Sequence, residues 1–153
     1  MRRCWTSIVL AIALTGALPA VAAIGKVNKV LPHYLDLEGR HSRSPSLFDR
    51  DAYQSKLRQH PELCSGVRFD IHWRVRSVNA SGFKLKVELR STAQGNLPVL
   101  KTIEQEVKGG VSARWTGITF SGDEFKQFGE ITAWRVTLWD GDQLLGEQKS
   151  FLW

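Results

Sequence analysis

The sequence has little cysteine, and this shortage limits how the fold can be held together. It has two cysteines among its 153 residues, Cys4 and Cys64. Cys4 lies before the apolar run of an expected signal peptide, so removal of that segment leaves Cys64 alone. A single cysteine cannot form a disulfide within its own chain. We therefore expect a domain that is stabilised by a hydrophobic core and has no disulfide framework.

The sequence also lacks the short motifs that mark common enzymes. It contains no G-x-S-x-G, no H-E-x-x-H and no phosphate-binding loop. His60 lies four residues before Cys64, but Pro61 interrupts any helix that would align the two side chains. Four other side chains are metal ligands by type, but their spacing matches no known site: His33, Asp36, Glu38 and His41. We expect no enzymatic activity, no cofactor and no metal, with a small enzyme kept as the least favoured alternative.

No apolar run is long enough for a comfortable transmembrane helix, which needs about 20 residues. The apolar run from Ile8 to Leu18 follows Arg2 and Arg3 and precedes several small residues, which is the arrangement of a secretory signal. We predict that residues 1–23 are a cleaved signal peptide. The mature protein is then periplasmic or secreted and has no stable membrane span, and the alternative is an uncleaved anchor.

The charge excess is modest. The net charge of the full chain is +6, and removal of Arg2 and Arg3 with the signal peptide lowers it to +4. Such an excess favours weak attraction to anionic polymers, but it is no nucleic-acid signature without a basic stripe or a known motif. We expect no nucleic-acid partner.

Alternating apolar and polar residues predict several β-strands. Residues 67–76 place Trp73 on an apolar face, and residues 83–90 alternate just as clearly. In the strand 131–139, Trp134 lies on the apolar face, and Asp140-Gly141-Asp142 supplies a turn into the last strand, 143–152. Two further strands are expected at 99–108 and 113–120. We predict that Trp73 and Trp134 are core residues.

Two segments of the chain have helical signals. Residues 46–60 predict a helix, because acidic residues lie in the first turns and basic residues near the end. Pro61 follows directly and would terminate it. Residues 121–128 predict a short helix between late strands. We therefore expect residues 24–66 to form a leader with a helix near 46–60 and an edge strand near 33–38, followed by an all-β antiparallel sandwich over 67–153.

The last hairpin carries a family resemblance. Residues 133–153, AWRVTLWDGDQLLGEQKSFLW, stand where immunoglobulin-like and fibronectin type III-like modules place their final hairpin. Residues 67–153 resemble such modules, although the sequence has no Cys, Trp, Cys framework. The whole chain is similar to small exported bacterial proteins. The resemblance implies an immunoglobulin-like sandwich and transfers no functional residue.

The leading functional hypothesis is a non-catalytic binding or assembly module of the cell envelope or extracellular space. If strands 67–76 and 83–90 pair as a hairpin, matching their apolar faces brings like charges together. These cations are Arg74, Arg76, Lys84 and Lys86. A bound anion would relieve their repulsion, so the expected partner is an anionic envelope polymer or an acidic protein surface. A solvated strand face, with the two strands in opposite sheets, is the alternative.

A carbohydrate-binding module is the second functional hypothesis. It requires exposed aromatic rings on which sugars stack. Trp139 lies beside the expected turn, and Trp115 is out of phase with Ile118, so both are candidates. Packing in the core or at a sheet edge is the competing explanation for each side chain.

Overall fold

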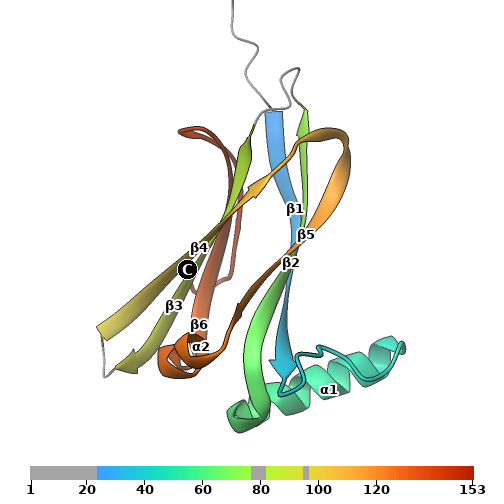
Figure 1. Ribbon diagram of the computed structural model, residues 1–153, viewed down its shortest axis with the longest axis vertical. Helices are drawn as coiled ribbons and strands as arrows, with labels where there is room; N and C mark the ends of the chain where they lie inside the picture. The colour runs from blue at the N-terminus through green and yellow to red at the C-terminus, as the bar shows by residue number, and fades with distance from the viewer. Residues whose placement is uncertain (1–23, 77–81, 95–96) are drawn as a thin grey trace, which may run out of the picture.

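The computed structural model describes residues 24–76, 82–94 and 97–153. The expected signal peptide, residues 1–23, lies outside this described part. The described chain forms two antiparallel sheets packed face to face, with one helix docked at one end and a second helix between late strands (Figure 1). The expected all-β sandwich is confirmed. None of the described helices is long and apolar enough to cross a membrane.

The first sheet, here called sheet A, has the strand order β1-β2-β5. Its strands are β1 (Ile24–Asp36), β2 (Cys64–Arg76) and β5 (Gly110–Ser121). The second sheet, sheet B, has the order β4-β3-β6-β7. Its strands are β4 (Leu97–Val107), β3 (Phe83–Gln94), β6 (Ile131–Asp140) and β7 (Gln143–Lys149).

Strand β1 corrects the expected leader. Residues 24–36 form a full edge strand that pairs with β2 along its length, rather than a leader with a short strand at 33–38. The pairing shifts register around Asn28, so Val27 and Val30 both face the core although they are three residues apart. Pro32 is tolerated because β1 lies at the edge of the sheet. The sandwich therefore begins before residue 67.

The expected hairpin between residues 67–76 and 83–90 is wrong. These residues belong to β2 in sheet A and β3 in sheet B, so they face each other across the core. Their alternation was identified correctly, since Ile71 and Trp73 on β2 and Leu85 and Val87 on β3 are all buried. Matching apolar faces meet across a sandwich as well as along a hairpin, and the alternative of opposite sheets is the one observed.

The closing hairpin is confirmed, with one correction at its end. Asp140 pairs with Gln143 around a two-residue turn in which Gly141 has a φ of 54°. The register shift in β7 lies beside Gly146. Beyond Lys149 the chain leaves the sheet, and the Phe151 side chain is fully exposed. The expected strand over 143–152 is therefore shorter than predicted.

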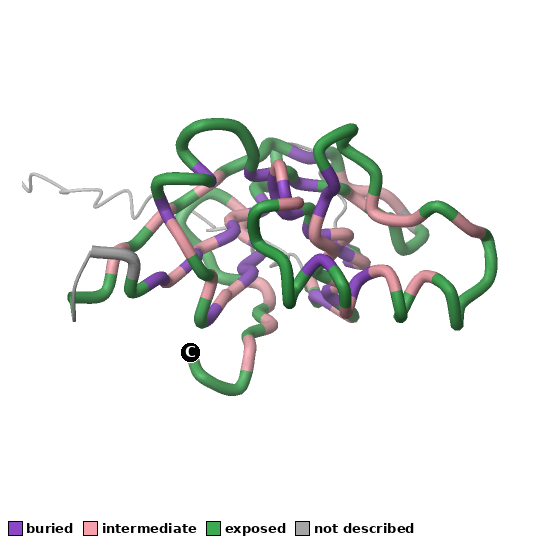
Figure 2. The backbone as a smooth tube through the Cα atoms, turned by 90° about the horizontal axis from the view of Figure 1, so that it is seen from below, coloured by how far each residue is buried: buried purple, intermediate pink, exposed green. Residues whose placement is uncertain are grey.

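The core fills the space between the sheets. Figure 2 shows buried residues in the middle of the molecule and exposed residues around them. Helix α2 (Asp123–Phe128) inserts Phe125 and Phe128 at one end of the core, where both rings meet Phe120 edge to face. Helix α1 (Leu47–Gln59) docks against the end of β1. There the Gln54 side chain accepts from the Tyr34 amide and donates to the Tyr34 carbonyl, as a neighbouring strand would.

Candidate binding face

The outer face of sheet A brings together basic side chains from β1 and β2 and an aromatic side chain from β5. Residues paired across neighbouring strands project on the same side of a sheet. Lys29 lies opposite His72, which lies opposite Trp115, so these three form one row across the sheet. Lys26 lies opposite Arg74 in the next row. We call the following set the basic face: Lys26, Lys29, His72, Arg74, Arg76 and Trp115.

The basic face is compact. Neighbouring strands lie about 4.8 Å apart, and alternate residues of a strand lie about 7 Å apart. The cations in the rows of Lys29 and Lys26 are therefore separated from one another by roughly one to two Debye lengths. The Debye length is about 8 Å at physiological ionic strength. Because these side chains are exposed and like-charged, they repel one another unless an anion lies between them.

The four cations of the basic face lack a paired carboxylate within the described part of the chain. None of Lys26, Lys29, Arg74 and Arg76 forms an ion pair with another residue in the described ranges. The carboxylate on the same outer face of β2, Asp70, is held by Arg68 at 2.8 Å. A row of cations without carboxylates favours binding of an anion.

Beyond Asp70, towards α1, the outer face of sheet A is electrically balanced. His33 Nε2 lies 3.7 Å from Asp70 Oδ2, and its ring lies 5.3 Å from the ring of His41. Burial lowers the pKa of His33 most strongly, and the charges of His41, Arg50 and Arg68 lower it further, whereas Asp70 acts in the opposite direction. The lowered pKa favours the neutral form of His33, so this end of the outer face adds little positive charge.

Trp115 is the large aromatic side chain of the basic face. The residue is 55% exposed, and its ring stacks on the His72 imidazole with centroids 4.8 Å apart and planes inclined by 21°. Because β5 is an edge strand of sheet A, no described strand lies beyond Trp115. One face of the indole is thus covered by His72, and the other faces solvent.

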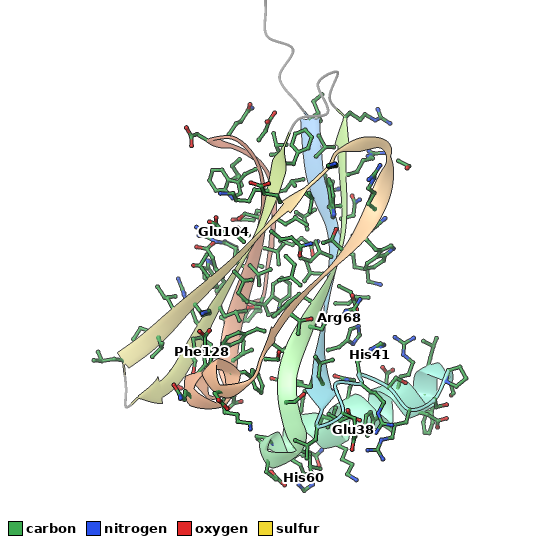
Figure 3. All side chains as sticks on the ribbon, viewed as in Figure 1. Glu38, His41, His60, Arg68, Glu104 and Phe128 are labelled. Atoms are coloured by element: carbon green, nitrogen blue, oxygen red, sulfur yellow. The ribbon has the colours of Figure 1, made fainter. Side chains whose placement is uncertain are left out.

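Arg74 and Arg76 therefore lie in the basic face, but the structure separates them from Lys84 and Lys86. The two lysines project from the outer face of sheet B, on the opposite side of the sandwich. Lys84 donates to Glu104 at 2.9 Å, and Lys86 lies 3.4 Å from Glu88. Figure 3 shows Glu104 on β4 and Arg68 on the other sheet. The predicted four-residue patch does not form, because the hairpin on which it depended is absent.

Trp139 also projects from the outer face of sheet B. It is only partly exposed, and its Nε1 donates to Thr137 Oγ1 at 2.8 Å. Farther along β6, Arg135 is bound by Glu88 and lies over the Trp153 ring. Lys84, Lys86 and Arg135 on the outer face of sheet B are thus paired with carboxylates. Of the two tryptophans proposed for sugar stacking, Trp115 is the more exposed.

The sequence prediction missed Lys26, Lys29 and His72 as members of the basic face. Lys26 and Lys29 were placed in a leader because the register shift at Asn28 hides the alternation of β1. A reading that allowed one bulge would have put both lysines on the outer face. His72 was missed because the sequence prediction paired the strand 67–76 with residues 83–90 and did not place β5 and Trp115 beside it.

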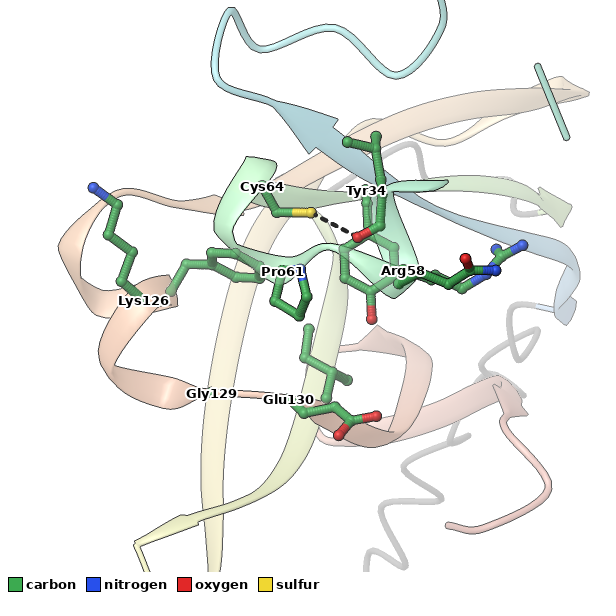
Figure 4. Close-up of a pocket in the computed structure, with 11 residues that line it drawn as sticks. Tyr34, Arg58, Pro61, Cys64, Lys126, Gly129 and Glu130 are labelled. Atoms are coloured by element: carbon green, nitrogen blue, oxygen red, sulfur yellow. Dashed lines mark hydrogen bonds between the residues drawn. The ribbon is translucent and has the colours of Figure 1, made fainter. Parts of the chain in front are cut away.

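A second feature is a hollow of about 490 Å³ at the helical end of the sandwich. Figure 4 shows Tyr34, Pro61 and Cys64 around it. The Cys64 thiol donates to the Leu57 carbonyl at 3.2 Å, and burial followed by the charge of Glu62 raises the pKa of this thiol. The His60 ring is bound to Glu62 instead of the thiol. Cys64 and His60 therefore do not form a nucleophile and base pair.

The side chains considered as metal ligands are engaged in other bonds. Asp36 accepts hydrogen bonds from the backbone and guanidinium of Arg40 and from the Tyr53 hydroxyl. Glu38 is bound by Arg40 and lies near Arg43. Figure 3 shows Glu38 and His41 together beside α1. Within the described residues no group of three or more His, Cys, Asp or Glu side chains is arranged to hold a metal ion.

Comparison of the chain with known proteins found no relative. No protein-family model, no curated protein and no solved structure matches the chain.

Proposed function

We propose that the chain is an exported, non-catalytic binding module of the cell envelope or extracellular space, and that its basic face holds an anionic partner. The observation that supports the proposal most directly is the set of four exposed cations without an ion pair to any described residue. On the outer face of sheet B, by contrast, Lys84, Lys86 and Arg135 are each paired with a carboxylate. An anionic partner would supply the counter-charge that the basic face lacks.

The scaffold suits this role. Lys26 and Lys29 are carried by β1, and Arg74 and Arg76 by β2, so the side chains are held at the fixed spacing of paired strands. Sites built on strands are positioned more precisely than sites on loops. The cations are spread over two paired strands instead of converging on one point, which fits an extended partner better than a small molecule.

The proposal is tested with the chain from residue 24 and a synthetic polyanion. Lys29→Gln combined with Arg74→Gln should weaken binding about tenfold, since each exposed charge contributes up to about 1 kcal/mol. The matched control is Lys84→Gln combined with Lys149→Gln, which removes two cations from sheet B. Isothermal titration at low and high salt gives the affinities, and circular dichroism verifies the fold.

The salt dependence tests whether charge contributes to binding, and the control variant tests whether the binding site is the basic face. Affinity of the parent should fall as salt rises, because exposed charges are screened. The control should bind like the parent. Equal losses in both double variants would show attraction to net charge alone, and unchanged affinity in the Lys29 and Arg74 variant would show that the basic face is not the site.

Export is tested separately. Mass spectrometry of the protein recovered outside the cytoplasm should find a chain that begins at Ala23 or Ile24. Recovery of an intact amino terminus in the membrane fraction would contradict the proposed soluble module.

A further inference from the structure

The free ring of Trp115 adds a second kind of recognition to the basic face. An exposed tryptophan leaves apolar surface in contact with water, which is unfavourable, and Trp115 is 55% exposed. The His72 ring stacks on it with centroids 4.8 Å apart, which favours this orientation of the indole. A rigid aromatic plane with one free face is a platform for a flat or weakly polar ring of a ligand.

We propose that the anionic partner is an acidic polysaccharide, and that one of its sugar rings packs on the free face of Trp115. This inference rests on the proposed function of the basic face. The C–H groups on one side of a sugar ring form a weakly polar surface that packs against an aromatic plane, while its carboxylate or sulfate groups pair with cations. Trp115 and the cations of the basic face supply these two complementary elements on one sheet.

The arrangement determines the size of the ligand. Lys29 lies two strands away from Trp115 across His72, a distance of about 10 Å at the spacing of paired strands. Arg74 lies one further row along β2. A single sugar cannot cover both the Trp115 ring at the edge and these cations. The partner is therefore an oligosaccharide or longer chain that crosses sheet A from β5 towards β1.

An acidic polysaccharide fits better than the other polyanions. A polypeptide rich in aspartate or glutamate supplies negative charge but no ring for Trp115. A single-stranded nucleic acid supplies rings, but its binding surfaces present several aromatic side chains to successive bases. The basic face presents one tryptophan, backed by His72, so a chain whose affinity comes mainly from charge and from one stacked ring is favoured.

The test compares four probes on the chain from residue 24: a polyuronate oligosaccharide, polyglutamate, a neutral oligosaccharide of equal length, and single-stranded DNA. The parent should bind the polyuronate most tightly. Trp115→Ala should weaken polyuronate binding about tenfold and leave polyglutamate binding unchanged, because only the sugar uses the ring. Trp115→Phe should recover part of the loss. Trp139→Ala, which changes a tryptophan on the opposite sheet, is the matched control and should bind like the parent.

The outcomes separate this inference from the proposed function. Equal affinity for polyuronate and polyglutamate, with no effect of Trp115→Ala on either, would overturn the polysaccharide and leave the basic face intact. Tightest binding to DNA with loss in Trp115→Ala would assign the platform to nucleic acid and also overturn it. If no polyanion binds and the charge variants change nothing, both proposals fail.

Since Trp115 is exposed, its variants should melt like the parent. Tryptophan fluorescence gives a second readout, because it should respond to polyuronate in the parent but not in Trp115→Ala.

Discussion

The Tyr53 hydroxyl donates a hydrogen bond of 2.7 Å to Asp36 Oδ2, and this bond joins α1 to the end of β1. Asp36 is buried, and its other oxygen accepts from the backbone amides of Glu38 and Arg40. These bonds therefore hold the helix, and the loop between β1 and α1, against the strand that carries Lys26 and Lys29.

Tyr53→Phe should lower the free energy of unfolding by about 1.5–3 kcal/mol, the usual range for a hydrogen bond to a charged group. The matched control is Tyr34→Phe, since the Tyr34 hydroxyl makes no hydrogen bond to a described residue. Urea denaturation of the two variants measures the difference. Equal stabilities would show that the bond to Asp36 contributes nothing beyond packing of the ring.

Asp36 should make stability depend on pH in the acid range. Burial alone would raise its pKa, but hydrogen bonds from the Arg40 backbone, the Tyr53 hydroxyl and the Arg40 side chain outweigh burial and hold the pKa well below the ordinary value of 3.8. The folded pKa is thus lower than the unfolded one. The stabilisation is fully present above the unfolded pKa, and it is lost as the pH falls below 3.8 towards the folded pKa.

Asp36→Asn should remove this part of the acid dependence and lower stability at neutral pH. Melting temperatures measured from neutral to strongly acidic pH give both slopes. The parent should approach the stability of the variant as the pH falls. Parallel curves for parent and variant would contradict the depressed pKa of Asp36.

The two tryptophans predicted to lie in the core should differ in their contributions. Trp73 is 2% exposed, and its Nε1 donates to Thr116 Oγ1 at 2.9 Å. Trp134 is only partly buried, although its ring meets Phe69 edge to face at 6.2 Å. Trp73→Ala should cost about 3–5 kcal/mol, and Trp134→Ala clearly less. Chemical denaturation of both variants gives the order, and a larger loss at Trp134 would reverse the assignment of the central core residue.

Alternation predicted most of the strands because each has one face against the core and one in water. In β3, for example, Leu85 and Val87 are buried between Lys84 and Glu88. The same alternation cannot tell a hairpin from two strands that face each other across a sandwich, since both bury matching apolar faces. The partner sheet of β3 was therefore not predictable from its own pattern, and the four-cation patch failed for this reason.

The candidate site was predicted in part. Arg74, Arg76 and Trp115 were identified, but as members of two separate hypotheses, because the sequence does not place β5 beside β2. The contribution of β1 was missed, since the bulge at Asn28 and the proline at position 32 obscure its alternation. The basic face depends on strand pairings between segments far apart in the chain, which local patterns do not determine.

Gly146 should be required for the close approach of β7 to β1, the strand that carries the lysines of the basic face. A Cβ atom at position 146 would lie 3.0 Å from Lys26 Cα and 3.0 Å from the Val27 amide nitrogen. Backbone atoms cannot move aside as a side chain can, so Gly146→Ala should force the two strands apart and cost about 1–3 kcal/mol. In Gly117→Ala the new Cβ would lie 2.7 Å from Arg68 Nη2, the end of a flexible side chain, so this control should change stability by less than about 0.5 kcal/mol. Thermal melts compare the two variants, and because Lys26 is among the displaced residues, Gly146→Ala should also weaken polyanion binding. A Gly146→Ala variant that melts and binds like the parent would show that β7 does not hold β1 in place.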